Sequence, residues 1–157
     1  MLKVQQTADG TGKCLTTTMP IRRDTAFHLI RQYRPATEKT YTSVQIGIND
    51  SIEEFYLAHL NHSCEPNVIV DTKKLELRAI RDIAPCEDLT FFYPSTEWHM
   101  AQPFQCSCGS PRCIGKVSGA RDLPLNLLGG YFVNQHIGAM AMEHLIGAQK
   151  LKTPIAV

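Results

Sequence analysis

Six cysteines are the residues of this sequence with the clearest capacity for chemistry, and three of them form a Cys-x-Cys-x4-Cys array. The array runs Cys106, Cys108, Cys113, and a glycine and a proline inside it permit a tight turn. Thiolates are zinc ligands, and a structural zinc site takes four ligands in a tetrahedron. Three sulfurs leave such a site one ligand short. The sequence therefore predicts zinc, held by a further cysteine from elsewhere; the candidates are Cys14, Cys64 and Cys86.

A second polar segment, residues 61–67, has the sequence Asn-His-Ser-Cys-Glu-Pro-Asn. Its two asparagines each offer a donor and an acceptor, and Pro66 fixes one backbone angle and restricts the residue before it. We interpret the segment as a shaped polar turn rather than a surface loop. Cys64 is attractive as the missing zinc ligand because it lies in a turn that is already rigid.

The composition bounds the function classes. With 157 residues, 43% of them hydrophobic and 20% charged, the chain suits one globular domain with an appended element. A net charge of +1 with scattered basic residues predicts no nucleic-acid partner. The N-terminus resembles no signal peptide and no long apolar run occurs, so we expect no membrane partner and a cytoplasmic or nuclear location. Thiols stay reduced there, which favours a metal over disulfides.

The elements that must position these residues begin with short strands. Residues 2–6 and 15–19 are predicted strands on either side of a glycine-containing turn. The pattern of residues 24–33 fits a helix and a strand equally well. Residues 40–48 alternate in polarity and predict a strand with one buried face.

The central segments are expected to deliver the polar turn. Ser51 is followed by an isoleucine and two glutamates, which predicts a capped short helix over residues 52–60 ending at the turn. Residues 68–71 and 75–80 predict a hairpin, and residues 89–93 predict an aromatic strand.

A C-terminal helix is predicted over residues 123–149. Its apolar stripe has helical spacing, although two glycines weaken it; the stripe is Ile137, Met140, Ala141, His144, Leu145 and Ala148. On that stripe, His144 is expected to be a core histidine rather than a ligand. The helix offers a surface for pairing with a second copy, so we also expect a possible homodimer.

Three segments, in this order, make the sequence similar to SET-domain methyltransferases with a post-SET zinc motif. Residues 61–67 resemble the family's Asn-His-Ser-Cys-x-Pro-Asn. Residues 88–93, Asp-Leu-Thr-Phe-Phe-Tyr, resemble its Glu-Leu-Thr-Phe-x-Tyr, and the cysteine array matches its post-SET spacing. The joint match, which spans residues 10–117, is specific where each motif alone would be weak.

The resemblance implies a mainly β fold with short helices, namely the SET-domain β-clip fold, plus a C-terminal zinc-bound post-SET loop and an appended helix. It divides the chain into a SET domain over residues 1–103, a post-SET segment over 104–117 and a helical extension over 118–157. It implies S-adenosylmethionine as methyl donor. It also implies Zn2+ held by four cysteines: Cys64, Cys106, Cys108 and Cys113.

The resemblance assigns roles to single residues as well. Tyr93 matches the catalytic tyrosine, which can orient the amine near the departing sulfur. Phe91 matches a Phe/Tyr switch position, where phenylalanine implies di- or trimethylation. The implied cofactor-binding residues are Lys13, Cys14, Leu15, Asn61, His62, Tyr93, Trp98 and Phe104, and the implied substrate-binding residues are Tyr41 and Phe91. Trp98 and Phe104 resemble aromatics that close the substrate channel; the alternative is that both are core aromatics.

The sequence departs from the family pattern at several points. Cys14 and Cys86 stand where many members have glycine, so a turn that needs positive φ is altered, or one of the two is a spare thiol. Residues 58–60 are Ala-His-Leu rather than the common Arg-Phe-x. No chromatin-reader module or long insert precedes the polar turn within this sequence, so we expect no obvious docking surface for a histone tail.

Three functions follow as expectations. The leading one is an S-adenosylmethionine-dependent N-methyltransferase acting on a lysine ε-amine of a protein or peptide. The second is methylation of a small-molecule amine. The third is a zinc-stapled interaction domain without turnover, against which the presence of Asn61, His62 and Tyr93 argues.

Overall fold

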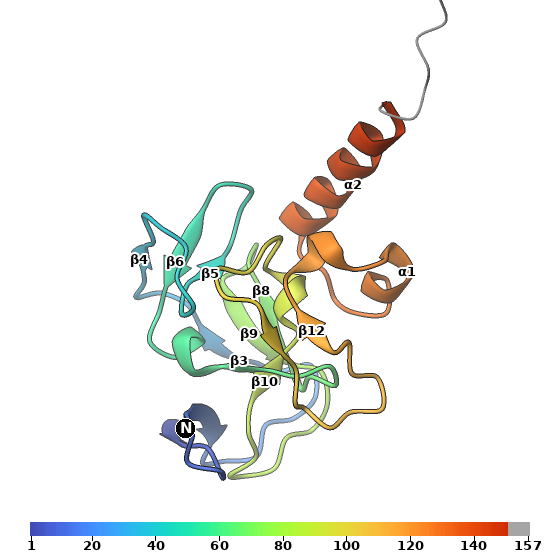
Figure 1. Cartoon of the computed structure of the whole chain (residues 1–157). Coiled ribbons are helices and arrows are strands. Elements are labelled where there is room, and N and C mark those ends of the chain that lie inside the picture. The colour runs from blue at the N-terminus through green and yellow to red at the C-terminus, as the bar shows by residue number, and fades with distance from the viewer. Residues whose placement is uncertain (151–157) are drawn as a thin grey trace, which may run out of the picture.

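A computed structural model describes residues 1–150, with Lys150 described by its backbone alone (Figure 1). The protein is mainly β, as predicted, and its helices are short except for the last. The strands are β1 (Leu2–Gln6), β2 (Lys13–Thr17), β3 (Ala26–Leu29), β4 (Arg34–Pro35), β5 (Val44–Gln45), β6 (Ser51–Glu53), β7 (Asn61–His62), β8 (Val68–Asp71), β9 (Glu76–Ala79), β10 (Thr90–Phe91), β11 (Phe104–Gln105) and β12 (Lys116–Val117). The helices are the 3-10 turns η1 (Leu57–His59), η2 (Tyr93–Ser95) and η3 (Ala120–Asp122), and the α-helices α1 (Leu125–Leu128) and α2 (Gln135–Lys150).

Small sheets surround one main core. The order β3-β9-β8 forms one three-stranded sheet and β4-β6-β5 another, while β1-β2, β7-β10 and β11-β12 are two-stranded. Buried aliphatic residues from these sheets, including Leu15, Leu60, Val68 and Leu77, form the main cluster. A second cluster around Phe92 and Ile137 joins α1 and α2 to the body.

The parallel pair β7-β10 positions the polar turn. Asn61 lies opposite Thr90 and His62 opposite Phe91, so the two motifs that are distant in sequence are neighbours in the fold. The backbone N–H of Ser63 extends the pairing by donating to the carbonyl oxygen of Phe91 (3.1 Å). As a result, Tyr93, two residues after the end of β10, lies close to His62 of β7.

The N-terminal predictions are confirmed with one shift. β1 pairs with β2 in antiparallel register, Leu2 opposite Thr17, but β2 begins at Lys13 rather than residue 15. The ambiguous residues 24–33 contain strand β3, because its backbone pairs with β9. Here sheet pairing decides between two patterns that propensity leaves equal.

The long strand predicted over residues 40–48 is wrong, since only Val44–Gln45 is a strand. Before it, the hydroxyl of Ser43 accepts a hydrogen bond from the N–H of Thr40 (2.9 Å), and the hydroxyl of Thr40 accepts one from the N–H of Ser43 (3.1 Å). After it, the N–H of Ile46 donates to the carbonyl of Asp50. Side-chain hydrogen bonds and a turn therefore replace the ladder at both ends.

The helix predicted over residues 52–60 is also wrong. Ser51 pairs with Gln45 of β5, and Ile52 pairs with both β5 and β4, so residues 51–53 form β6 and only the single turn η1 remains helical. Glu54, not Ser51, caps that turn, since its carboxylate accepts hydrogen bonds from the N–H groups of Tyr56 and Leu57 (2.8 Å each). The two glutamates after Ser51 correctly indicated a helix start nearby, but the helix is only the single turn η1.

The predicted hairpin is confirmed by β8 and β9, which pair from Val68–Ala79 to Asp71–Glu76. Leu75 closes its turn with a φ of 53°. The predicted strand 89–93 is shorter than expected, because Tyr93 already begins η2.

The single C-terminal helix predicted over residues 123–149 is divided into α1 and α2. Asn134 holds the break between them, since its Nδ2 donates to the carbonyl oxygens of Val70 (2.8 Å) and Ser95 (2.9 Å). Ile137 is fully buried, whereas Leu145 is exposed, so the apolar stripe packs only at its start. Figure 1 shows α2 extending away from the sheets.

The prediction that His144 is a core histidine is wrong. The residue is exposed, and its ring contacts the edge of Trp98 at 5.8 Å. No helix within residues 1–150 is long and apolar enough to cross a membrane. Pairing of two copies through α2 stays a prediction.

Candidate functional site

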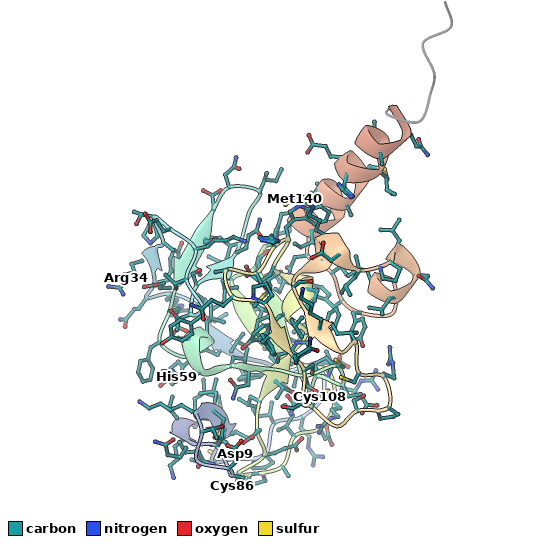
Figure 2. The ribbon with its side chains drawn as sticks, viewed as in Figure 1. Asp9, Arg34, His59, Cys86, Cys108 and Met140 are labelled. Carbon is teal, nitrogen blue, oxygen red and sulfur yellow. The ribbon has the colours of Figure 1, made fainter. Side chains whose placement is uncertain are left out.

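Four cysteine side chains converge beside the polar turn. The Sγ atoms of Cys64, Cys106, Cys108 and Cys113 all lie within 4.8 Å of one another. Figure 2 marks Cys108 on the loop between β11 and β12. The sulfurs of Cys64 and Cys106 are 3.9 Å apart, close to the ~3.8 Å expected between neighbouring ligands of a tetrahedral zinc–thiolate centre. The donor set therefore fits zinc, and the fourth cysteine is Cys64 rather than Cys14 or Cys86.

The loop geometry prepares these sulfurs as ligands. The N–H of Ile114 donates to the Sγ of Cys64 and the N–H of Gly115 to that of Cys113, both at 3.4 Å. Burial raises the pKa of Cys64 and raises that of Cys106 to about 11. At Cys108, burial acts in the same direction, but hydrogen bonds from the backbone outweigh it and lower the pKa to about 7. A bound cation would favour the thiolate form at every ligand.

His62 links the cysteine cluster to Tyr93. Its Nδ1 accepts a hydrogen bond from the backbone N–H of Tyr93 (3.2 Å), so the ring proton resides on Nε2, which lies 3.3 Å from the Sγ of Cys64. Burial lowers the pKa of His62 to about 4, which keeps the imidazole neutral. The imidazole of His62 thus contacts both Cys64, a candidate zinc ligand, and the backbone of Tyr93.

The hydroxyl of Tyr93 is buried beside the end of η1. It donates to the carbonyl oxygen of Leu60 (3.1 Å). Burial, and secondarily the charge of Glu97, raise the pKa of Tyr93 to about 12. The phenol therefore stays protonated and can act as a hydrogen-bond donor throughout the physiological pH range.

Two cavities meet at Tyr93. An open cleft of about 430 Å3 is lined by Asn61, His62, Phe104 and the loop from Cys106 to Cys108. On the other side lies a narrow cavity of about 30 Å3 between Val44, Leu57, Leu60 and Phe91. Tyr41, Tyr93 and Met100 line both spaces. The cleft has the size of a small-molecule site. The narrow cavity has aliphatic and aromatic residues on part of its wall and polar residues, Glu97 among them, on the rest.

The structure brings most of the predicted site residues to the cleft. Asn61 Nδ2 donates to the carbonyl oxygen of Lys13 (2.9 Å), which connects β2 to the polar turn. Phe104 presents its ring edge-on to His62 and Tyr93, at 6.0 and 6.1 Å. Tyr41 is 73% exposed at the mouth of both cavities.

Four predicted cofactor-binding side chains lie elsewhere. Lys13 is exposed at the start of β2 and does not line the cleft. Cys14 and Leu15 are buried in β2, so only their backbone could reach a ligand. Trp98 packs against the second core cluster and lines neither cavity. Met100, by contrast, lines both spaces, and sequence reasoning missed it because a lone methionine outside the motifs carries no signal.

The family comparison agrees with this site. The SET domain model matches residues 11–94, more than half of the chain. The methyltransferase flvH of Aspergillus flavus is 46% identical over 106 residues, covering 66% of this chain and 60% of that protein. An H3 lysine-36 specific histone-lysine N-methyltransferase of Aspergillus oryzae is 42% identical over 65 residues, covering 38% of this chain and only 7% of that protein.

Solved structures show the same fold at low sequence identity. KRYPTONITE in complex with DNA, an H3 peptide and SAH is 20% identical, with a TM-score of 0.52 over 73% of this chain and 29% of that one. The methyltransferase domain of human SETMAR is 19% identical, with a TM-score of 0.53 over 75% of this chain and 58% of that one. The sequence match, the shared fold and the converging motifs lead to one conclusion: this chain belongs to the SET domain family.

Proposed function

We propose that this protein is an S-adenosylmethionine-dependent N-methyltransferase that acts on a lysine ε-amine of a protein or peptide. The observation that carries the proposal is the meeting of a cofactor-sized cleft and a narrow cavity at Tyr93. Membership of the SET domain family supports it. This chain spans 60% of the length of the flvH methyltransferase and 7% of the length of the histone-lysine N-methyltransferase. Its activity and substrate are therefore proposed from the site.

The cleft fits the proposed methyl donor. Asn61 offers a polar group on one wall, and the rings of His62, Tyr93 and Phe104 line the space. Aromatic rings stabilise a neighbouring cation, and the donor is a sulfonium. S-adenosylmethionine, when bound, supplies an activated methyl group to the acceptor.

The narrow cavity marks the approach of the acceptor, although it must widen to admit a lysine side chain. Leu57, Leu60 and Phe91 give it apolar surface that suits a methylene stem. Its polar lining includes Glu97, whose charge would attract an approaching amine. Tyr93, at its inner end, can orient the neutral amine by hydrogen bonding, so the protein acts by positioning the two reactants in line.

Zinc has a structural role in this proposal. Cys64, Cys106, Cys108 and Cys113 would hold it with four sulfurs, which leaves no open position for substrate. We propose the division inferred from the sequence: a SET domain over residues 1–103, a post-SET zinc segment over 104–117 and a helical extension over 118–157. Zinc would thereby fix Phe104 and the cysteine loop as one wall of the cleft.

A small-molecule amine is the second candidate substrate. The segment between β6 and β7 contains only the single turn η1. An unbranched primary alkylamine presents to the narrow cavity the same end as a lysine side chain does. Such an amine would need no long docking groove.

Methyl transfer from labelled S-adenosylmethionine to a panel of lysine peptides and alkylamines tests the proposal. We expect transfer by the wild type and a loss of roughly 100-fold in kcat for Tyr93→Phe, because the positioned hydroxyl is removed. Tyr33→Phe, on an exposed tyrosine, is the matched control and should retain activity. Peptide-only transfer supports the first substrate class and amine-only transfer the second. Equal turnover by Tyr93→Phe and wild type would remove Tyr93 from catalysis, and a lack of any transfer would favour a non-catalytic domain.

A further inference from the structure

A separate cavity of about 580 Å3 lies behind the polar turn, and we call it the arginine cavity. It is bounded by Arg81, Phe92, Ser95, Arg112 and Tyr131. Aliphatic residues of β8 and Ile80, the residue after β9, also belong to this lining. None of its lining residues lines the cleft or the narrow cavity at the proposed methyl-transfer site. Its volume falls in the range of small-molecule sites.

The walls of the arginine cavity suit an aromatic ring. Phe92 and Tyr131 stack face to face, with centroids 3.7 Å apart and planes 4° from parallel. The hydroxyl of Tyr131 donates to the carbonyl oxygen of Cys64 (2.8 Å), which fixes the orientation of the stack. Val68 and Ile80 contribute aliphatic surface beside it. A planar apolar group would find a rigid wall rather than mobile side chains.

Arg112 supplies an available positive charge. Its guanidinium lies 5.1 Å from the ring centroid of Tyr131, and no carboxylate within residues 1–150 forms an ion pair with it. Arg81 differs, because it is paired with Glu87 at 2.5 Å. Glu65 also lines the cavity as its one acidic residue and is exposed. Arg112 is therefore the side chain prepared to bind an anion.

Ser95 adds a buried polar group. The residue is 3% exposed, and its hydroxyl makes no hydrogen bond to any residue among 1–150 that the structure describes. Its backbone is held in place by contacts of its carbonyl oxygen with Asn134. This hydroxyl is therefore free to form a hydrogen bond with a ligand or with water in the cavity.

We propose that the arginine cavity binds a small aromatic carboxylate, with the ring beside the Phe92–Tyr131 stack and the two carboxylate oxygens shared between the Arg112 guanidinium and the Ser95 hydroxyl. The proposal goes beyond methyl transfer, because it concerns a second site. Arg112 lies in the loop between Cys108 and Cys113, so such a ligand would contact the cysteine-bearing loop from the side opposite to the cleft.

Titration of 15N-labelled, zinc-loaded protein with 2-naphthylacetate, followed by backbone amide shifts, tests this site. We expect saturable shifts at Ser95, Ile80 and Gly130. Arg112→Gln should weaken 2-naphthylacetate roughly tenfold, because a charge-assisted hydrogen bond is lost. The neutral twin 2-(2-naphthyl)ethanol should bind Arg112→Gln and wild type equally. Arg121→Gln, on an exposed arginine outside the cavity, is the matched control and should bind as the wild type does.

Ser95→Ala provides a second variant that leaves the cysteine loop unaltered, and it should weaken 2-naphthylacetate by a few fold. Zinc content and an unchanged dispersion of the amide spectrum show that a variant is folded. A separate apolar groove, of about 410 Å3, lies between α1 and α2, with Leu125 and Leu145 in its lining. Three results would overturn the proposal: no saturable shifts, shifts confined to that groove, or equal affinity for 2-naphthylacetate in Arg112→Gln and wild type.

Discussion

Asn67 shows how one polar side chain joins two motifs. Its Nδ2 donates to the carbonyl oxygen of Asp88 (2.8 Å) and to Oε1 of Glu87 (3.2 Å), and its Oδ1 accepts from the N–H of Thr90 (2.8 Å). The residue is 1% exposed. Because these three side-chain bonds go to Glu87, Asp88 and Thr90, Asn67 ties the polar turn to the start of β10, whose pairing with β7 brings Asn61 and His62 beside Tyr93.

We expect Asn67→Ala to lower the free energy of unfolding by about 2–3 kcal/mol, since buried backbone partners would lose their bonds. Urea unfolding followed by circular dichroism measures this. Asn49→Ala, on an exposed asparagine, should change stability by less than ~0.5 kcal/mol. Equal stability of the two variants would show that the Asn67 network contributes nothing.

The residues of the site were largely predictable, because the motifs carry their own spacing. Cys64 was one of three candidate ligands, and a residue-level argument could not choose among them from spacing alone. Folding selects it because β7 pairs with β10 and places the turn against the loop of Cys106. The stack of Phe92 with Tyr131 left no sequence signal, since it joins residues of different elements.

At the scale of elements, η1 depends on Glu54. Burial opposes ionisation of this carboxyl, but the His28 side chain 3.4 Å away and the N–H groups of Leu57 and Tyr56 outweigh it and hold the pKa below its ordinary value. A carboxyl with a lowered pKa stabilises the folded state above its unfolded pKa, and the contribution is lost as pH falls through the folded one.

We therefore expect Glu54→Gln to lower the free energy of unfolding by about 1–2 kcal/mol at pH 7. The difference from wild type should shrink as the pH falls below about 4.5. Urea unfolding at several pH values measures both. Glu38→Gln, on an exposed glutamate, should show neither effect. A difference that does not depend on pH would contradict the role of the charge.

Cys86 and Cys14 both stand where many family members have glycine, but they lie in different backbone conformations. Cys86 has a φ of 66°, which is the left-handed region that favours glycine, whereas Cys14 is buried in the extended strand β2. We expect Cys86→Gly to raise the free energy of unfolding by up to ~1 kcal/mol. Cys14→Gly should lower it by about 2 kcal/mol. Thermal unfolding that moves both variants in the same direction would contradict this account.

At the scale of the whole molecule, the mainly β fold and the order of the motifs followed from the sequence. The failures lie where side-chain hydrogen bonds override periodicity. Local bonds between Thr40 and Ser43 shorten the strand at 40–48, and tertiary bonds of Asn134 interrupt the C-terminal helix. His144 shows the same limit, because its stripe continues beyond the part of α2 that packs. Periodicity predicts which face of a helix is apolar, but not how far along the helix that face is buried.

The polar turn contributes residues both to the cleft and to the neighbouring cysteine cluster. Asn61 and His62 line the cleft, while Cys64 contributes to the proposed zinc site, and His62 contacts both Cys64 and Tyr93. Loss of zinc should therefore impair cofactor binding as well as folding stability.

Calorimetric titration of S-adenosylmethionine into zinc-loaded and zinc-depleted protein tests this account most directly. Elemental analysis of the loaded protein should give one zinc per chain. We expect the loaded protein to bind one equivalent of S-adenosylmethionine and the depleted protein to bind it at least tenfold more weakly, because the wall of the cleft loses its anchor. An absence of binding heat from folded, zinc-loaded protein at several temperatures would contradict the proposal that the cleft at Tyr93 is a methyl-donor site.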